Sequence, residues 1–114
     1  MLVYLESLGC RLNTAETETL ARRFAGAGYD VVATPEAADV IVLNSCAVTA
    51  QAARKSRRRL RTLHRLSPQA RLAVVGCWAT EDVTRAAALP GVAWIIPNTE
   101  KARAVEIITG VDAV

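Results

Sequence analysis

The chain has 114 residues, of which 52% are hydrophobic and 22% are charged, and its formal net charge at pH 7 is +3. These values are typical of one globular domain with an ordinary core, and they exclude a disordered chain. No apolar run approaches the ~18 residues that a membrane span needs. The first ten residues contain an acidic side chain and no basic one, unlike a signal peptide. We therefore expect a cytoplasmic protein with no membrane partner.

Five strand-like runs alternate with helix-like segments along the chain. We expect strands near residues 2–7, 29–32, 39–44, 71–75 and 93–96. The third run is the most apolar, so we expect it at the centre of a sheet. We expect helices after Asn13, from residue 49 or 50 to just before Pro68, after Thr80, and over residues 99–109. This order predicts a three-layer α/β domain of the Rossmann or flavodoxin-like kind. Its open, mostly parallel five-stranded sheet would carry helices on both faces.

Local signals mark the first expected helix. Asn13, with Glu16 three residues later, is typical of a capping box that opens a helix. Gly26 and Gly28 are typical of its end. The side of this helix that we expect to face the core carries Leu20, Phe24 and Ala27.

Each of the three cysteines follows a strand-like run and precedes a helix-like one. These residues are Cys10, Cys46 and Cys77. An odd number of cysteines fits reduced thiols or metal ligands better than a disulfide framework. Because parallel strands present their carboxyl ends at one edge, where open α/β sheets hold ligands, three thiolates could converge there. Gly9 and Gly76 would let the backbone crowd close to a bulky ligand. Three thiolates are one short of the four that usually hold a four-iron cluster, so one iron would be left free to react.

Other interpretations of the cysteines stay open. Each cysteine can be a small buried hydrophobic residue, as free cysteine often is. A zinc site made of the three cysteines and His64 is the competing metal site. Geometry argues against it, because His64 lies near the end of its expected helix and thus some 20 Å from Cys46, at ~1.5 Å rise per residue. No dinucleotide-binding or P-loop motif follows the strands.

The expected helix after Cys46 is strongly basic. Between Asp39 and Glu81 there are eight basic residues and no acidic one, which leaves six basic against eleven acidic residues elsewhere. Four arginines recur at i, i+4, i+7 and i+11 and form one stripe: Arg54, Arg58, Arg61 and Arg65. The other side of the helix carries Ala53, Leu60 and Leu63. The stripe is either a solvated surface or an RNA-binding face, and the lack of acids around it favours RNA.

These segments resemble the N-terminal domain of the radical-SAM methylthiotransferase family. The matching residues are Leu8-Gly9-Cys10-Arg11-Leu12-Asn13 with Glu16 and Glu18, Asn44-Ser45-Cys46-Ala47-Val48-Thr49, Ala53, Lys55-Ser56-Arg57 and Val75-Gly76-Cys77-Trp78-Ala79. The match covers nearly the whole chain. The Cys-x-Val-Thr and Lys-Ser-Arg elements look most like the branch acting on threonylcarbamoyl-adenosine beside the tRNA anticodon. Ser45 and Trp78 stand where many members have Thr and Tyr.

The resemblance implies part of an enzyme that adds a methylthio group to a modified adenosine of tRNA. By this resemblance, Cys10, Cys46 and Cys77 would hold an auxiliary 4Fe-4S cluster whose free iron carries the sulfur. Residues 1–114 lack the Cys-x-x-x-Cys-x-x-Cys motif of the radical-SAM domain, which binds S-adenosyl-L-methionine and a second 4Fe-4S cluster. They also lack the C-terminal RNA-binding domain, so we expect them to be inactive alone, with tRNA and the radical-SAM domain as partners. Two alternatives are a stand-alone cysteine- or zinc-dependent α/β enzyme and a non-catalytic RNA-binding module.

Overall fold

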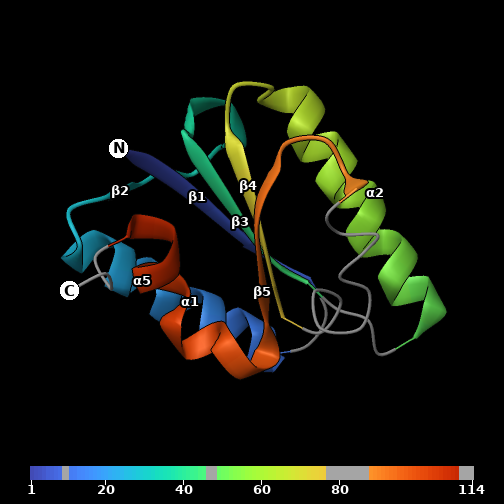
Figure 1. Cartoon of the computed structure of the whole chain (residues 1–114), viewed down its shortest axis with the longest axis horizontal. Coiled ribbons are helices and arrows are strands. Elements are labelled where there is room, and N and C mark those ends of the chain that lie inside the picture. Colours follow the sequence, from blue (N-terminus) through green and yellow to red (C-terminus); the bar gives the residue numbers. More distant parts are fainter. Residues whose placement is uncertain (9–10, 46–48, 77–87, 111–114) are drawn as a thin grey trace.

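The computed structural model of the chain describes residues 1–8, 11–45, 49–76 and 88–110 (Figure 1). The strands are β1 (Leu2–Ser7), β2 (Asp30–Val31), β3 (Val40–Ser45), β4 (Arg71–Gly76) and β5 (Val92–Pro97). The helices are α1 (Arg11–Gly26), α2 (Ala50–Leu66), α5 (Ala104–Thr109) and the short 3-10 helices η1 (Pro35–Ala37) and η2 (Asn98–Arg103). The helix predicted after Thr80 falls largely outside the described residues.

The five strands form one sheet in the order β2-β1-β3-β4-β5, and all four pairings are parallel. This is the strand order of flavodoxin-like folds. Every residue of β3 is buried, as expected for a strand covered on both faces. The predicted parallel sheet, with its third strand at the centre, is therefore confirmed.

Helices cover both faces of the sheet and make three layers (Figure 1). On one face α1 and α5 pack on the sheet through a buried cluster that includes Leu20, Phe24, Val42, Val105 and Ile108. On the other face α2 packs through a separate cluster that includes Ile41, Leu43, Leu60, Leu63 and Leu72. The sheet separates these two clusters, so the three-layer architecture follows from the apolar stripes of the helices.

Helix α2 begins and ends as its sequence indicates. The hydroxyl of Thr49 accepts a hydrogen bond from the backbone N–H of Ala52 at 3.0 Å, which caps the first turn. The helix stops at Leu66, two residues before Pro68.

None of the helices in the described part of the chain has the length and apolar character of a membrane span.

Helix α1 differs from its predicted form at both ends. It begins at Arg11, so Asn13 lies inside the first turn, and the capping box of Asn13 and Glu16 is wrong. The Asn13 amide donates to carbonyls outside its own helix, as described below. At the other end the helix stops at Gly26, and Gly28 has a φ of +93°. Ala27 therefore lies beyond the helix and is exposed, so its predicted place in the core is wrong.

The last predicted helix forms in two pieces. Residues 98–103 adopt the tighter 3-10 form and only Ala104–Thr109 are α-helical. Gly110 ends this segment with a φ of +75°. The helical span from 99 to 109 is thus confirmed, although its first half has a different hydrogen-bond pattern.

Candidate functional site

The strands β1, β3 and β4 are neighbours in the sheet, and each ends at its carboxyl edge shortly before one of the three cysteines in the sequence. The last residues described before these cysteines, here called the three strand ends, are Leu8, Ser45 and Gly76. In the parallel register Ser7 lies opposite Asn44, and Ser45 lies opposite Gly76. Cys10, Cys46 and Cys77 themselves lie outside the described residues, so their convergence stays a prediction. Elsewhere, among the residues whose placement is described, no three His, Cys, Asp or Glu side chains gather as a metal site.

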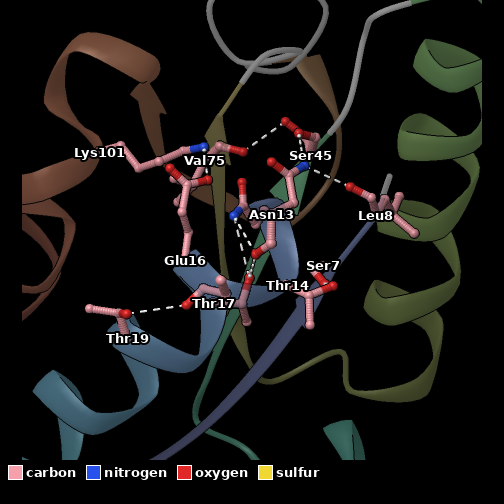
Figure 2. Close-up of polar contacts among 12 residues, drawn as sticks. Ser7, Leu8, Asn13, Thr14, Glu16, Thr17, Thr19, Ser45, Val75 and Lys101 are labelled. Carbon is pink, nitrogen blue, oxygen red and sulfur yellow. Dashed lines mark hydrogen bonds and ion pairs between the residues drawn. The ribbon is translucent and has the colours of Figure 1, made fainter. Parts of the chain in front are cut away.

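Asn13 of α1 joins the first two strand ends (Figure 2). Its side-chain Nδ2 donates to the carbonyl oxygen of Leu8 at 2.7 Å and to that of Ser45 at 3.3 Å. The backbone N–H of Leu8 in turn donates to the carbonyl of Asn44 at 3.0 Å. Asn13 is only 5% exposed, and its contact with Ser45 is buried while that with Leu8 is partly buried.

Ser45 joins the second strand end to the third (Figure 2). Its hydroxyl donates to the carbonyl oxygen of Val75 at 2.8 Å, and both residues are fully buried. Val75 immediately precedes Gly76 at the end of β4. Side-chain hydrogen bonds therefore link the three strand ends in addition to the backbone hydrogen bonds of the sheet.

Asn44, the residue before Ser45, attaches α1 to the centre of the sheet. Its Nδ2 donates to the carbonyl of Asn13 at 3.2 Å and to the hydroxyl of Thr17 at 3.3 Å. The Thr17 hydroxyl donates to the same Asn13 carbonyl at 2.8 Å. These bonds fix the first turns of α1, and with them the Asn13 side chain.

The Asn44 side-chain oxygen lies against the third strand end. This Oδ1 atom is buried and has no hydrogen-bond partner among the residues that the structure describes. A Cβ at Gly76 would lie 2.7 Å from it and 3.0 Å from the carbonyl of Ser45. Gly76 also has a φ of +103°, which L side chains rarely adopt. Position 76 therefore requires glycine for both space and backbone conformation.

A positive charge lies beside the same strand end. The Nζ of Lys101, in η2, would be 3.5 Å from a Cβ at Gly76. Lys101 is held there by an ion pair of 2.8 Å with Glu16 of α1 (Figure 2). The pair lines an open groove of about 580 Å³ between α1 and η2. This basic side chain was not foreseen, because Lys101 and Glu16 are 85 residues apart.

A second polar cluster lies between β1 and α2. The Tyr4 hydroxyl donates to Glu6 at 2.7 Å, and the Arg59 guanidinium donates to both carboxylate oxygens of Glu6. Burial by itself raises the pKa of Glu6, but the hydrogen bonds from Arg59 and Tyr4 outweigh it and lower that pKa below its usual value. The hydrogen bond to Glu6 raises the pKa of Arg59, and burial raises the pKa of Tyr4. The ionised pair is therefore the stable form at neutral pH.

The arginine stripe faces solvent along α2. Arg54, Arg58, Arg61 and Arg65 are all exposed. On the opposite side of the helix Leu60 and Leu63 are buried, and Ala53 packs against the same cluster. This division of the helix is confirmed, whereas RNA binding by the stripe stays a prediction.

His64 lies at the amino edge of the sheet. A Cβ at Gly91, the residue before β5 begins, would be 2.5 Å from the Nδ1 of His64. The three strand ends are at the opposite, carboxyl edge. The predicted placement of His64 away from the carboxyl edge is thus confirmed, whereas its distance from Cys46 stays a prediction, because Cys46 lies outside the described residues.

Comparisons with known proteins give the chain's relatives. Residues 2–96 match the model of a family described as "Uncharacterized protein family UPF0004". The chain is 36% identical over 108 residues to the threonylcarbamoyladenosine tRNA methylthiotransferase MtaB of Aquifex aeolicus, which covers 95% of the chain and 26% of that protein. It is 39% identical over 80 residues to the tRNA-2-methylthio-N(6)-dimethylallyladenosine synthase of Chloroherpeton thalassium, covering 68% and 18%. The chain thus spans about a quarter or less of the length of these curated relatives.

A solved structure shows the same fold. A pilus assembly protein (CpaE) from Burkholderia thailandensis superposes with a TM-score of 0.66, covering 100% of this chain and 99% of that one. The two sequences are 17% identical, so this likeness concerns the fold alone.

Proposed function

This chain belongs to the UPF0004 family, the N-terminal domain of methylthiotransferases, and we propose that it binds the auxiliary 4Fe-4S cluster of a tRNA methylthiotransferase. The observation that carries the proposal is the adjacency of Leu8, Ser45 and Gly76 at one edge of a parallel sheet. Each of them stands one or two residues before a cysteine. Peptides of 3.8 Å per residue keep the three cysteines near that edge.

The residues at this edge fit a bulky inorganic group. Cys10, Cys46 and Cys77 would be the ligands, and thiolates are the usual ligands of iron–sulfur clusters. Gly76, the third strand end, carries no side chain that would fill the space beside Asn44 and the Ser45 carbonyl. The Lys101 ammonium nearby would favour a site of net negative charge. When bound through three thiolates, such a cluster supplies one iron without a protein ligand, at which sulfur can be held.

The substrate and partners follow from the same proposal. The substrate would be a modified adenosine beside the tRNA anticodon. The threonylcarbamoyl branch is favoured because the match to the Aquifex enzyme covers 95% of the chain, against 68% for the Chloroherpeton enzyme. The exposed arginine stripe on α2 supports contact with the tRNA backbone. S-adenosyl-L-methionine and the second 4Fe-4S cluster would belong to a radical-SAM domain that acts with this one. A tRNA substrate would place the protein in the cytoplasm.

Anaerobic reconstitution with iron and sulfide tests the proposal. We expect about four irons per chain and a brown, oxygen-sensitive product. Changing any one of Cys10, Cys46 or Cys77 to Ala should remove most of the iron, because two thiolates hold a cluster poorly. Full iron loading in any single variant would contradict the assignment. Stoichiometric zinc in protein grown without added metal would favour a zinc-dependent enzyme instead.

A non-catalytic RNA-binding module is the second candidate, because the exposure of the stripe does not depend on metal binding by the cysteines. The stripe consists of Arg54, Arg58, Arg61 and Arg65. A triple Cys→Ala variant separates the two functions. Undiminished RNA binding together with a wild-type chain that takes up no iron would favour the module.

A further inference from the structure

We infer that Asn13 and Ser45 are positioning residues that set the spacing of the three cysteine segments before any metal is bound. This role rests on the proposed function, since it concerns the same edge of the sheet. We call the two side chains, with the three carbonyl oxygens they bind, the Asn13–Ser45 clamp. Those carbonyls belong to Leu8, Ser45 and Val75.

The clamp reaches every cysteine segment through its backbone. Asn13 binds the carbonyl of Leu8, two residues before Cys10, and that of Ser45, directly before Cys46. Ser45 binds the carbonyl of Val75, two residues before Cys77. A planar amide offers two N–H groups from one nitrogen at a fixed angle. One side chain thus bridges the ends of the first two strands, and a second bridges the next two (Figure 2).

The clamp is itself rigidly held. Asn13 and Ser45 are both buried, so water has little access to their donors. The Asn13 backbone carbonyl accepts hydrogen bonds from Asn44 and Thr17, which ties the donor residue to β3 and α1. Because each side chain is itself fixed, its hydrogen bonds restrain the positions of the carbonyls that it binds.

The placement of these bonds separates the clamp from ordinary sheet pairing. Leu8 lies one residue beyond the end of β1, and Ser45 is the last residue of β3. The backbone register already holds the strands together up to these points. The side-chain bonds act where the strands turn into the cysteine segments, so their loss should disturb those segments more than the sheet. Groups that orient metal ligands from behind commonly change metal affinity by about 10- to 100-fold when removed.

Arsenite binding by the reduced, metal-free chain tests the inference without a cluster. One As(OH)₃ condenses with three thiols and releases three waters, with no change in oxidation state, so tight binding requires three converging thiols. Asn13→Asp keeps the shape of the side chain but replaces its donor group with a carboxylate that repels the two carbonyls. Ser45→Ala removes the second donor, and Ser45→Thr restores a hydroxyl. Thr19→Ala is the matched control, because the exposed Thr19 donates only within α1, to Ala15.

We expect wild type, Thr19→Ala and Ser45→Thr to bind one arsenite per chain with similar affinity. Asn13→Asp and Ser45→Ala should bind roughly 10- to 100-fold more weakly while keeping the circular dichroism of the wild type. Wild-type affinity in both folded variants would overturn the clamp. If Asn13→Asp does not fold, the comparison of Ser45→Ala with Ser45→Thr decides, and equal affinity of these two overturns it.

The same measurements separate the clamp from the proposed function. A wild-type chain that binds arsenite tightly but takes up no iron and sulfide would reject the cluster while the clamp stands. The clamp alone would be rejected if the wild-type chain takes up about four irons but the wild type, Asn13→Asp and Ser45→Ala all bind arsenite with equal affinity. Failure of the wild type to bind either arsenite or iron would reject both.

Discussion

Glu6 of β1 and Arg59 of α2 form a two-point ion pair, in which Nε and Nη2 of the guanidinium donate to the carboxylate at 2.5 and 2.7 Å. The Glu6 side chain is 17% exposed and that of Arg59 34%. This paired geometry is more directional than a single contact between charges. Because α2 starts directly after the Cys46 segment, the pair fixes the orientation of the helix that leads away from the candidate site.

Replacing Glu6 by Gln should destabilise the domain by roughly 1–2 kcal/mol, because a partly buried guanidinium loses its charged partner. Urea unfolding at pH 7 measures this change. The matched control is Glu100→Gln, since Glu100 and Arg103 are 45% and 55% exposed and 3.7 Å apart. That exposed pair should contribute less than about 0.5 kcal/mol. Equal effects of the two substitutions would contradict the structural role of the Glu6–Arg59 pair.

The contribution of Glu6 should depend on pH in a definite direction. Its pKa in the folded protein lies below that in the unfolded chain, so the folded state favours the ionised carboxylate. The stabilisation is therefore fully present above the unfolded-state pKa of about 4.3 and is lost as the pH falls through the folded-state pKa. The difference in unfolding free energy between wild type and Glu6→Gln should shrink from pH 5 towards about pH 2. A difference that stays constant over this range would refute the lowered pKa.

Gly76→Ala should destabilise the domain by about 2–3 kcal/mol. The new methyl group would meet Asn44 and the Ser45 carbonyl, and the backbone would remain at a φ of +103°. Gly26→Ala is the natural comparison, because no atom lies within 4 Å of its added Cβ and its φ is not positive. That change should be neutral or stabilise the domain by up to about 1 kcal/mol. Thermal unfolding of both variants measures the contrast, and a Gly76→Ala domain as stable as wild type would contradict this geometry.

Reversing the charge of the arginine stripe should weaken RNA binding without unfolding the domain. The variant changes Arg54, Arg58, Arg61 and Arg65 to Glu. Four phosphate contacts would give wild type a log–log salt slope of about −3 to −4 through counterion release. Fluorescence anisotropy with tRNA at several salt concentrations gives the slope, which should become markedly shallower in the variant. Binding should be weak and largely independent of sequence, because reading an unstacked base needs a pocket.

Two double variants with the same change in net charge test whether the position of the arginines on α2 matters for RNA binding. Arg54→Glu with Arg58→Glu changes the net charge as much as Arg22→Glu with Arg71→Glu, and all four side chains are exposed. Only the first pair should reduce the slope appreciably. An unchanged slope in the quadruple variant would reject an RNA-facing stripe. Normal tRNA binding with lost association to a radical-SAM domain would instead make α2 a docking surface for that domain.

The 114 residues alone should make no methylthio product from S-adenosyl-L-methionine and tRNA. They contain three cysteines, and these are not arranged as the Cys-x-x-x-Cys-x-x-Cys motif that binds the radical-generating cluster. Mass spectrometry of the digested tRNA nucleosides measures the product. Turnover by the 114 residues would overturn this division of labour between domains.

The sheet was predictable because few arrangements satisfy its sequence pattern. Apolar runs alternating with helices leave essentially one solution, a parallel sheet with right-handed crossovers. The long apolar run of β3 could only be buried on both faces, which placed it at the centre. The outward side of α2 was equally predictable, since the 3.6-residue period separates Leu60 and Leu63 from the stripe.

The polar network at the carboxyl edge was not predictable in the same way. Asn13 followed by Glu16 is a common capping pattern. The carbonyls to which the Asn13 amide donates belong to the ends of strands, and their positions are known only from the folded structure. Glu16 instead pairs with Lys101 of η2. Buried polar contacts of this kind depend on the register of the sheet, which local sequence does not encode. The available signals were a polar residue, Asn44, near the end of a mostly apolar strand and an asparagine, Asn13, at the start of a helix.

Arg58 and Arg59 are adjacent in the sequence but differ in how far lysine can replace them. Arg58, like the rest of the stripe, presents its charge to solvent, and a lysine would present the same charge. Arg59 uses the planar shape of its guanidinium to reach both oxygens of Glu6, which the single ammonium of a lysine does not reproduce. Substitution of lysine for arginine should therefore be tolerated along the stripe, whereas at Arg59 it would break the two-point contact between α2 and the sheet.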